Sequence, residues 1–127
     1  MIIRAVESVD APAWEAMRRD LWPEGGDDHG HEIAAFFAGT LDEPRAVFVV
    51  QEGSSLIAFA ELSTRDDIKE LAGKKLGYIE GLNVVPSFRH RGVAHQLLSV
   101  ARRWARQNRL EAFAGDRAGR IIVDPHF

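Results

Sequence analysis

The residues best suited to chemistry in this sequence form a basic turn between an apolar stretch and a helical pattern. Arg89, Arg91 and Gly92 follow the apolar run 78–85, and from Val93 onward apolar residues recur at spacings of three and four. The sequence therefore predicts a strand, a glycine-bearing turn and a helix in succession. The first amides of a helix have no partner within it and lie at the positive end of its dipole, so this turn could bind a phosphate. Because many α/β proteins use the same pattern only to turn a corner, these residues alone leave both interpretations open.

Two carboxylates could bind a cationic amine or accept its proton. Glu80 lies inside the apolar run, where a carboxylate is costly unless it faces a cleft, a partner or solvent. Asp116 follows the next expected strand, 110–114, and neighbouring strands could bring it to the same end of the sheet. A carboxylate in a cleft can bind an ammonium group or take its proton, whereas a strand residue that points to solvent does neither. Both possibilities are open for Glu80.

Other kinds of catalytic site find no support in the sequence. The chain has no cysteine, which excludes a thiol nucleophile, a thiolate metal site and a disulfide. His29 and His31 form a pair without a third ligand, so we expect them to lie in a polar loop and to bind no metal. No combination of serine, histidine and aspartate suggests a hydrolytic triad.

Composition predicts one soluble domain over residues 1–127. The hydrophobic content of 46% and the charged content of 28% are those of a globular protein with one core. No apolar run is long enough to span a membrane and no signal-peptide pattern is present, so we expect a cytoplasmic protein. A net charge of -3 gives no indication of a nucleic-acid partner. The arginines of 89–109 could support one, but Phe88 and Trp104 look like core residues and not a stacking platform.

The order of expected elements defines the fold class. We expect the order β-α-α-β-β-β-α-β, with antiparallel hairpins first and one right-handed crossover later. This is an α+β fold, with a mixed, mainly antiparallel sheet flanked by helices. The expected strands are 1–6, 45–51, 56–62, 78–85 and 110–114, and the expected helices are 12–22, 32–38 and one from residue 93 onward.

The turn also contains a specific sequence motif. Arg89-x-x-Gly92-x-Ala94 resembles the signature of the GNAT superfamily of N-acetyltransferases, which implies the GNAT fold and acetyl-coenzyme A as co-substrate. By this resemblance the turn would hold the pyrophosphate of the co-substrate, and the end of the preceding strand would hold it through the backbone. The residues implied are Leu82, Asn83 and Val84 in the strand, and His90, Arg91, Gly92, Val93, Ala94 and His95 in the turn.

Further segments are similar to the aminoglycoside 6′-N-acetyltransferase branch of that superfamily. They are Leu21-Trp22-Pro23, Phe59-Ala60-Glu61, Tyr78-Ile79-Glu80-Gly81, Trp104-Ala105 and Glu111-Ala112-Phe113-Ala114-x-Asp116. The resemblance implies that Trp22, Glu80 and Asp116 contact an aminoglycoside, and that Glu80 binds or deprotonates its amine. The amine would attack the acetyl group directly. The sequence alone, without the resemblance, favours a core aromatic at a helix end as the interpretation of Trp22.

The resemblance ends near Asp116. The sequence of 117–127 departs from the family, so we expect the C-terminal strands to be missing or truncated. The strand 110–114 would then have an unpaired edge, because the apolar run 121–123 is too short for a full strand pair. We therefore expect a homodimer that covers this side. The alternative function is a catalytically weak or inactive paralogue that binds coenzyme A or a cationic ligand.

Overall fold

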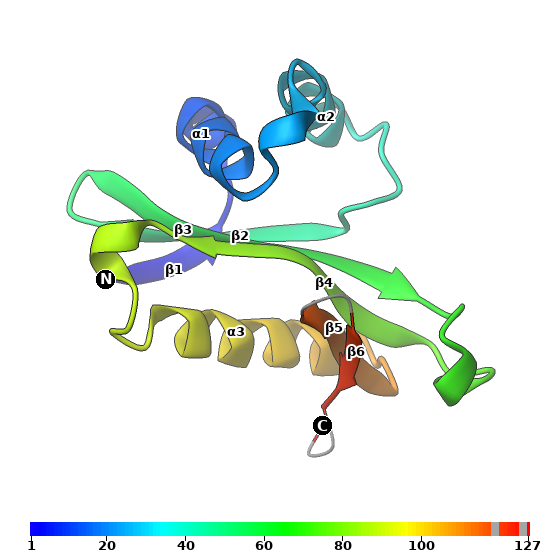
Figure 1. Ribbon diagram of the computed structural model, residues 1–127. Coiled ribbons are helices and arrows are strands. Elements are labelled where there is room, and N and C mark those ends of the chain that lie inside the picture. The colour runs from blue at the N-terminus through cyan, green and yellow to red at the C-terminus, as the bar shows by residue number, and fades with distance from the viewer. Residues whose placement is uncertain (118–119, 125–126) are drawn as a thin grey trace.

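A single mixed sheet, with helices on both faces, forms the protein (Figure 1). The computed structural model describes residues 1–117, 120–124 and 127. Across these residues the strands follow one another in chain order, and every neighbouring pair is antiparallel except the parallel pair β4–β5. The strands are β1 (Ile2–Ala5), β2 (Ala46–Glu52), β3 (Ser55–Arg65), β4 (Leu76–Val84), β5 (Ala112–Arg117) and β6 (Arg120–Val123). The expected α+β class is confirmed.

Three helices cover the two faces of the sheet in the described part of the chain. Helices α1 (Ala11–Leu21) and α2 (Asp28–Ala38) lie over one face, and α3 (Val93–Gln107) lies under the other (Figure 1). The buried residues of α3 recur every four positions, which places one apolar stripe against the sheet. They are Val93, Leu97, Ala101 and Ala105. Short 3-10 turns at Ser8–Asp10, Pro23–Gly25, Lys69–Leu71 and Pro86–Phe88 complete the described elements.

A β-bulge shapes the middle of β4. Glu61 pairs with Gly81 and Leu62 pairs with Ile79, so Glu80 is an extra residue in β4. A bulge bends its strand and redirects side chains. The parallel pairing with β5 covers only Leu76–Ile79 and stops at this point. Alternate residues of an antiparallel strand direct their N–H and C=O groups away from the partner, so β4 beyond the bulge has backbone groups that β5 does not use.

Helix α2 begins four residues earlier than the sequence pattern predicts. His29 therefore lies in the helix, and it is buried with only 2% of its surface exposed. Its Nε2 lies 2.7 Å from the carbonyl oxygen of Trp22, and the two aromatic rings stack with an interplanar angle of 14°. The expectation that His29 lies in a polar surface loop is wrong, because the carbonyl at the end of α1 and the indole ring provide a buried place for the imidazole.

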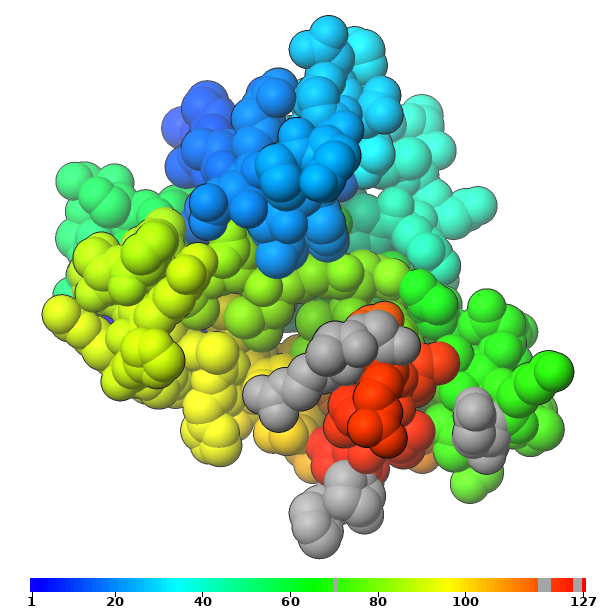
Figure 2. Space-filling model, in the orientation of Figure 1, coloured from blue at the N-terminus to red at the C-terminus, as the bar shows by residue number. Residues whose placement is uncertain are grey.

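The tail of the chain forms a strand. Residues Arg120–Val123 pair antiparallel with the end of β5, so the expected unpaired edge on that strand is wrong. The short strand is held by more than its ladder: Arg102 of α3 forms an ion pair with Asp124, and the rings of Phe113 and Phe127 stack with centroids 5.9 Å apart. These contacts from α3 and β5 explain how so short an apolar run forms a strand. In the space-filling view β6 lies on the molecular surface (Figure 2).

Candidate active site

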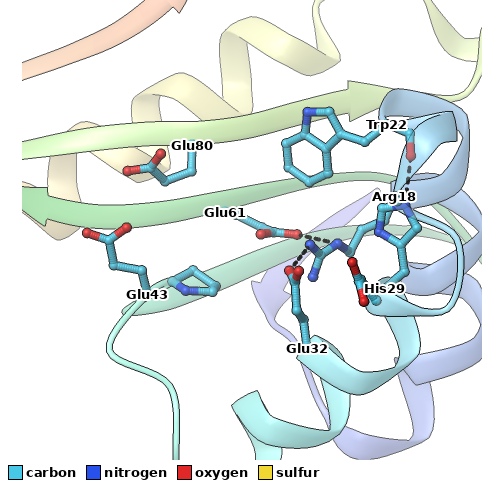
Figure 3. A pocket seen from close by; sticks show the side chains of 10 residues that line it. Arg18, Trp22, His29, Glu32, Glu43, Glu61 and Glu80 are labelled. Atoms are coloured by element: carbon cyan, nitrogen blue, oxygen red, sulfur yellow. Dashed lines mark hydrogen bonds and ion pairs between the residues drawn. The ribbon is translucent and has the colours of Figure 1, made fainter.

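An acidic cavity lies between β4 and the α1–α2 layer (Figure 3). Its volume is about 410 Å³. Five of the lining side chains are carboxylates, and Arg18 is the one arginine or lysine among the lining residues, so the cavity favours a cationic ligand. The lining residues are Arg18, Trp22, Gly25, Asp28, His29, Glu32, Glu43, Pro44, Glu61 and Glu80.

Glu80 projects from the bulge into this cavity. Both of its carboxylate oxygens accept hydrogen bonds from Arg65, at 2.7 and 2.9 Å. The guanidinium of Arg65 also lies over the ring of Tyr78, 4.0 Å from its centroid. The side chain of Glu80 keeps 21% of its surface exposed. Glu80 is therefore fixed in direction and open to the cavity, which is the cleft position that the sequence left as one of two possibilities.

Trp22 closes one side of the cavity and lies directly on β4. It follows α1 and precedes the turn Pro23–Gly25, and the guanidinium of Arg18 lies 5.3 Å from the centroid of its ring. A Cβ atom built on Gly81 would lie only 2.4 Å from the Trp22 ring. The indole can therefore approach the strand this closely only because residue 81 has no side chain. Trp22 is partly exposed, so it is a wall of the cavity and not a fully buried core aromatic.

We expect Gly81→Ala to displace Trp22 and to lower the free energy of unfolding by about 1–3 kcal/mol, the usual cost of overpacking a rigid site. The affinity of the acidic cavity for a cationic ligand should fall with it. Urea unfolding and titration calorimetry measure the two effects. Gly30→Ala is the matched control, because a Cβ there would approach only the end of the flexible Glu15 side chain. A Gly81→Ala variant as stable as the wild-type chain would show that Trp22 can lie elsewhere without cost.

A buried ionic network forms the floor of the cavity, and the sequence analysis assigned it no role. Glu61 accepts a hydrogen bond from Trp14 Nε1 at 3.0 Å and lies 3.4 Å from Arg18 Nε. Arg18 in turn donates to Glu32 (Figure 3). Burial raises the pKa of Glu61, while Arg18 and the hydrogen bond from Trp14 act in the opposite direction. The available signal was a glutamate inside the apolar strand 56–62, which is the same argument that identified Glu80.

The basic turn presents the N-terminus of α3. Gly92 has a φ of 81° and His90 a φ of 63°, so both are in the left-handed region, and the first bond within the helix runs from Gln96 N–H to Gly92 C=O. The amides before Gln96 are therefore not used by the helix. His90, Arg91, Gly92 and His95 are exposed, whereas the side chain of Val93 is buried in the core. This arrangement can bind an anion through backbone N–H groups.

The side chain of Arg89 bonds within the protein. Its Nε donates to the carbonyl of Val84 at 2.8 Å, and its Nη2 donates to Asn83 Oδ1 at 3.2 Å. Asn83 itself donates to the carbonyl of Met17 and to Asp20. Arg89 thus ties the turn to the end of β4 and to α1. The side chain of Asn83 is occupied by these bonds, so a ligand of this residue would meet its backbone.

A second hollow, a groove of about 480 Å³, lies on the α3 side where β4 and β5 separate. It contains Leu82 and Ala94, so it adjoins the basic turn, and its lining is mainly apolar. Its lining residues are Ile79, Leu82, Ala94, Leu98, Arg102, Phe113, Ala114, Gly115, Asp116, Ile122, Val123 and Asp124. Ile79 lines the groove and its neighbour Glu80 lines the acidic cavity, so the two hollows meet β4 one residue apart.

Asp116 lines the groove and not the acidic cavity. Ile79↔Gly115 is the last register pair of β4 and β5, and Glu80 and Asp116 each follow directly after it in their own strands. The pKa of Tyr78 lies above its ordinary value, chiefly because the ring is buried. The charges of Asp116 and Glu80 raise this pKa further, whereas the charge of Arg65 opposes the rise. The two carboxylates thus lie around the same tyrosine but face different hollows.

The described residues also bear on metal binding and on membrane insertion. No group of three or more histidine, cysteine, aspartate or glutamate side chains among them could hold a metal ion. None of their helices has the length and apolar character needed to cross a membrane.

The family model described as the acetyltransferase (GNAT) family matches residues 12–120. This match covers most of the chain, and the protein belongs to that family. The fold and the turn before α3 agree with it.

Within this family, the chain is similar to several aminoglycoside 6'-N-acetyltransferases. The chain is 38% identical over 117 residues to "Aminoglycoside N(6')-acetyltransferase type 1" of Klebsiella aerogenes, covering 91% of this chain and 77% of that protein. It is similar to the structure of the antibiotic 6'-N-acetyltransferase AAC(6')-IG from Acinetobacter haemolyticus, with a TM-score of 0.81, 27% identity and coverage of 93% and 80%. It is also similar to AAC(6')-Iy in complex with the bisubstrate analogue CoA-S-monomethyl-acetylneamine, with a TM-score of 0.80, 29% identity and coverage of 92% and 79%.

Proposed function

We propose that this protein transfers the acetyl group of acetyl-coenzyme A to the 6′-amine of an aminoglycoside, and so confers resistance in the cytoplasm. The observation that carries the proposal is the pairing of the two hollows, which meet β4 at Ile79 and Glu80. One hollow is acidic and suits a polycationic acceptor. The other is apolar, adjoins an anion-binding turn and suits a long cofactor arm with a pyrophosphate. The names of the relatives agree with both halves.

The acceptor side comprises Trp22 and Glu80, with the other carboxylates of the acidic cavity around them. Glu80 binds the reacting ammonium, held in direction by Arg65. An ammonium between carboxylates gains charge-assisted hydrogen bonds, which are about twice as strong as neutral ones. Asp116 is proposed to reach the same amine from β5, close to where the donor ends.

The donor side comprises the backbone of Leu82, Asn83 and Val84 and the turn from His90 to His95. Beyond the bulge, β4 has backbone amide and carbonyl groups that form no hydrogen bond with β5. An extended ligand such as the arm of coenzyme A can pair with these groups as an added strand would. The same amides can polarise the thioester carbonyl. In the turn, His90, Arg91, Gly92, Val93, Ala94 and His95 surround the pyrophosphate. The amine attacks the acetyl carbon directly, since the chain has no cysteine to form an acyl-enzyme.

The experiment is titration calorimetry with acetyl-coenzyme A and then with kanamycin. We expect both to bind, and kanamycin binding to weaken steeply as salt is added, because the cavity attracts it through charge. Binding of coenzyme A without kanamycin would favour a paralogue that acts on another amine or on none. Binding of neither would contradict the proposal.

We propose further that the protein is a homodimer. Strand β6 ends the described sheet, and Ile121 and Ile122 on it are 44% and 51% exposed. An edge strand with exposed apolar residues favours pairing with a second chain. Light scattering at rising concentration tests this expectation. A strict monomer at high micromolar concentration would contradict it.

A further inference from the structure

We propose that Glu61, on the floor of the acidic cavity, is the group that receives the proton of the acceptor ammonium. The inference rests on the proposed function and adds one residue to it. The two strand glutamates then have separate roles: Glu80 binds the amine, and Glu61 accepts its proton.

Glu80 is already held by an arginine. Arg65 engages both of its carboxylate oxygens, so Glu80 has a permanent cationic partner. Glu80 thus has no carboxylate oxygen that is free of a protein partner. This arrangement fixes the direction of Glu80 and suits it to orienting a cation.

Glu61 lies beside Glu80, on the neighbouring strand. It lies on β3 directly opposite Gly81, the residue that follows Glu80, and it lines the same cavity. Trp14 and Arg18 both approach its Oε2. No hydrogen bond to its Oε1 is formed within the part of the chain that the structure describes. This carboxylate is 3% exposed, so it is nearly buried and keeps one acceptor oxygen unused.

Charged and titratable groups from several elements surround Glu61. Arg18 on α1 and His29 on α2 favour its ionised form, and Glu32 on α2 opposes it. Glu80 on β4 and the outer carboxylates Asp28 and Glu43 line the same cavity. Burial outweighs the favourable partners, so the pKa of Glu61 lies above its ordinary value. A raised pKa brings a carboxylate closer to the pH at which a general base works best.

The reaction then balances as follows. The N–H bond of the acceptor ammonium breaks, and its proton passes to Glu61, directly or through one water molecule. The freed electron pair on nitrogen forms the new bond to the acetyl carbon, and the bond from that carbon to sulfur breaks. The second proton that nitrogen loses passes to the departing sulfur of coenzyme A, and Glu61 later releases its own proton to solvent.

The test compares Glu61→Gln with the wild-type chain. The variant keeps the shape of the side chain and an oxygen for Trp14, so we expect it to fold. We expect kcat for kanamycin at pH 7 to fall about 100-fold, the lower range for loss of a general base, with KM nearly unchanged. The wild-type rate should fall with unit slope below the pKa of Glu61. In Glu61→Gln only free amine can react, so the rate should rise steadily with pH and show no such break, whereas Glu61→Asp should retain the break.

The matched control is Asp10→Asn. Asp10 is also a buried carboxylate paired with an arginine, Arg4, but it lies away from the cavity. A structural effect of losing such a pair should appear in both variants as lower stability, whereas the change in pH profile should appear only at Glu61. A direct check is carbon-13 NMR of labelled glutamate carboxyls, in which the signal missing from Glu61→Gln should titrate above the ordinary value of about 4.3.

The outcomes separate the two proposals. Turnover by Glu61→Gln within threefold of the wild-type chain, or a change confined to KM, would overturn the role of Glu61 and leave the proposed function standing. A Glu61 signal that titrates at or below the ordinary value would also overturn it. Absence of turnover by the wild-type chain with every aminoglycoside would overturn both.

Discussion

Replacing Gly92 by valine should lower the affinity for coenzyme A by about 10-fold to 100-fold, the equivalent of losing one charge-assisted hydrogen bond. Gly92 precedes α3 with a φ of 81°, and no atom lies within 4 Å of a Cβ built there. The Cβ of the new side chain would therefore point into open space. It would occupy the space over the free amides of the turn, where we place the pyrophosphate, and it would strain the backbone. Titration calorimetry measures the loss.

Gly53→Val is the control for strain. Gly53 has a φ of 61° in the turn between β2 and β3, and it too has no atom within 4 Å of a built Cβ. Both variants should lose about 1–2 kcal/mol of stability, the cost of the left-handed conformation for a residue with a side chain. Only Gly92→Val should lower the affinity for coenzyme A. Equal affinity in a folded Gly92→Val variant would remove the turn from the binding site.

Replacing Glu80 by glutamine should weaken kanamycin binding by about 10-fold to 100-fold at low salt, since a hydrogen bond to a charged group contributes roughly 1.5–3 kcal/mol. The neutral side chain no longer attracts the ammonium, and it also removes the ion-pair partner of Arg65 beside the cavity. The effect should shrink as salt screens the remaining carboxylates. The affinity for coenzyme A should barely change.

Glu52→Gln is the matched control, because it removes the same charge from the far end of β2. Asp116→Asn provides a second comparison. If Asp116 reaches the acceptor, this variant should weaken kanamycin binding as Glu80→Gln does. If Asp116→Asn lowers only the affinity for coenzyme A, Asp116 contacts the co-substrate in the groove and not the acceptor. Loss of coenzyme A in Glu80→Gln, with kanamycin binding intact, would refute the assignment of the acidic cavity.

The local elements around the site could be predicted from the sequence because each has a strong pattern. The apolar run before Pro86, the glycine at residue 92 and the four-residue stripe of α3 each follow from periodicity or backbone preference. The bulge at Glu80 could not be predicted, because it depends on the register between β3 and β4 and no residue type marks it.

Other features depend on contacts between distant segments. The early start of α2 relies on the bond from His29 to Trp22, and β6 relies on α3 and β5 as well as on its own three apolar residues. Glu61 and Arg18 were visible in the sequence but meet only when β3 packs under α1. Charge pairs of this kind have no local pattern, whereas a buried glutamate in an apolar strand is a signal that can be searched for.

The central claim is that the two hollows on β4 hold the two substrates of one acetyl transfer. The most direct measurement is the release of the coenzyme A thiol by the purified chain, with acetyl-coenzyme A and kanamycin together and with each alone. We expect release only when both are present, with the acetyl group found on the 6′-amine of the product and with the rate sharply reduced in Glu80→Gln and Gly92→Val. If both ligands bind and no kanamycin-dependent thiol appears, the chain binds these molecules without catalysing the transfer, and the claim is wrong.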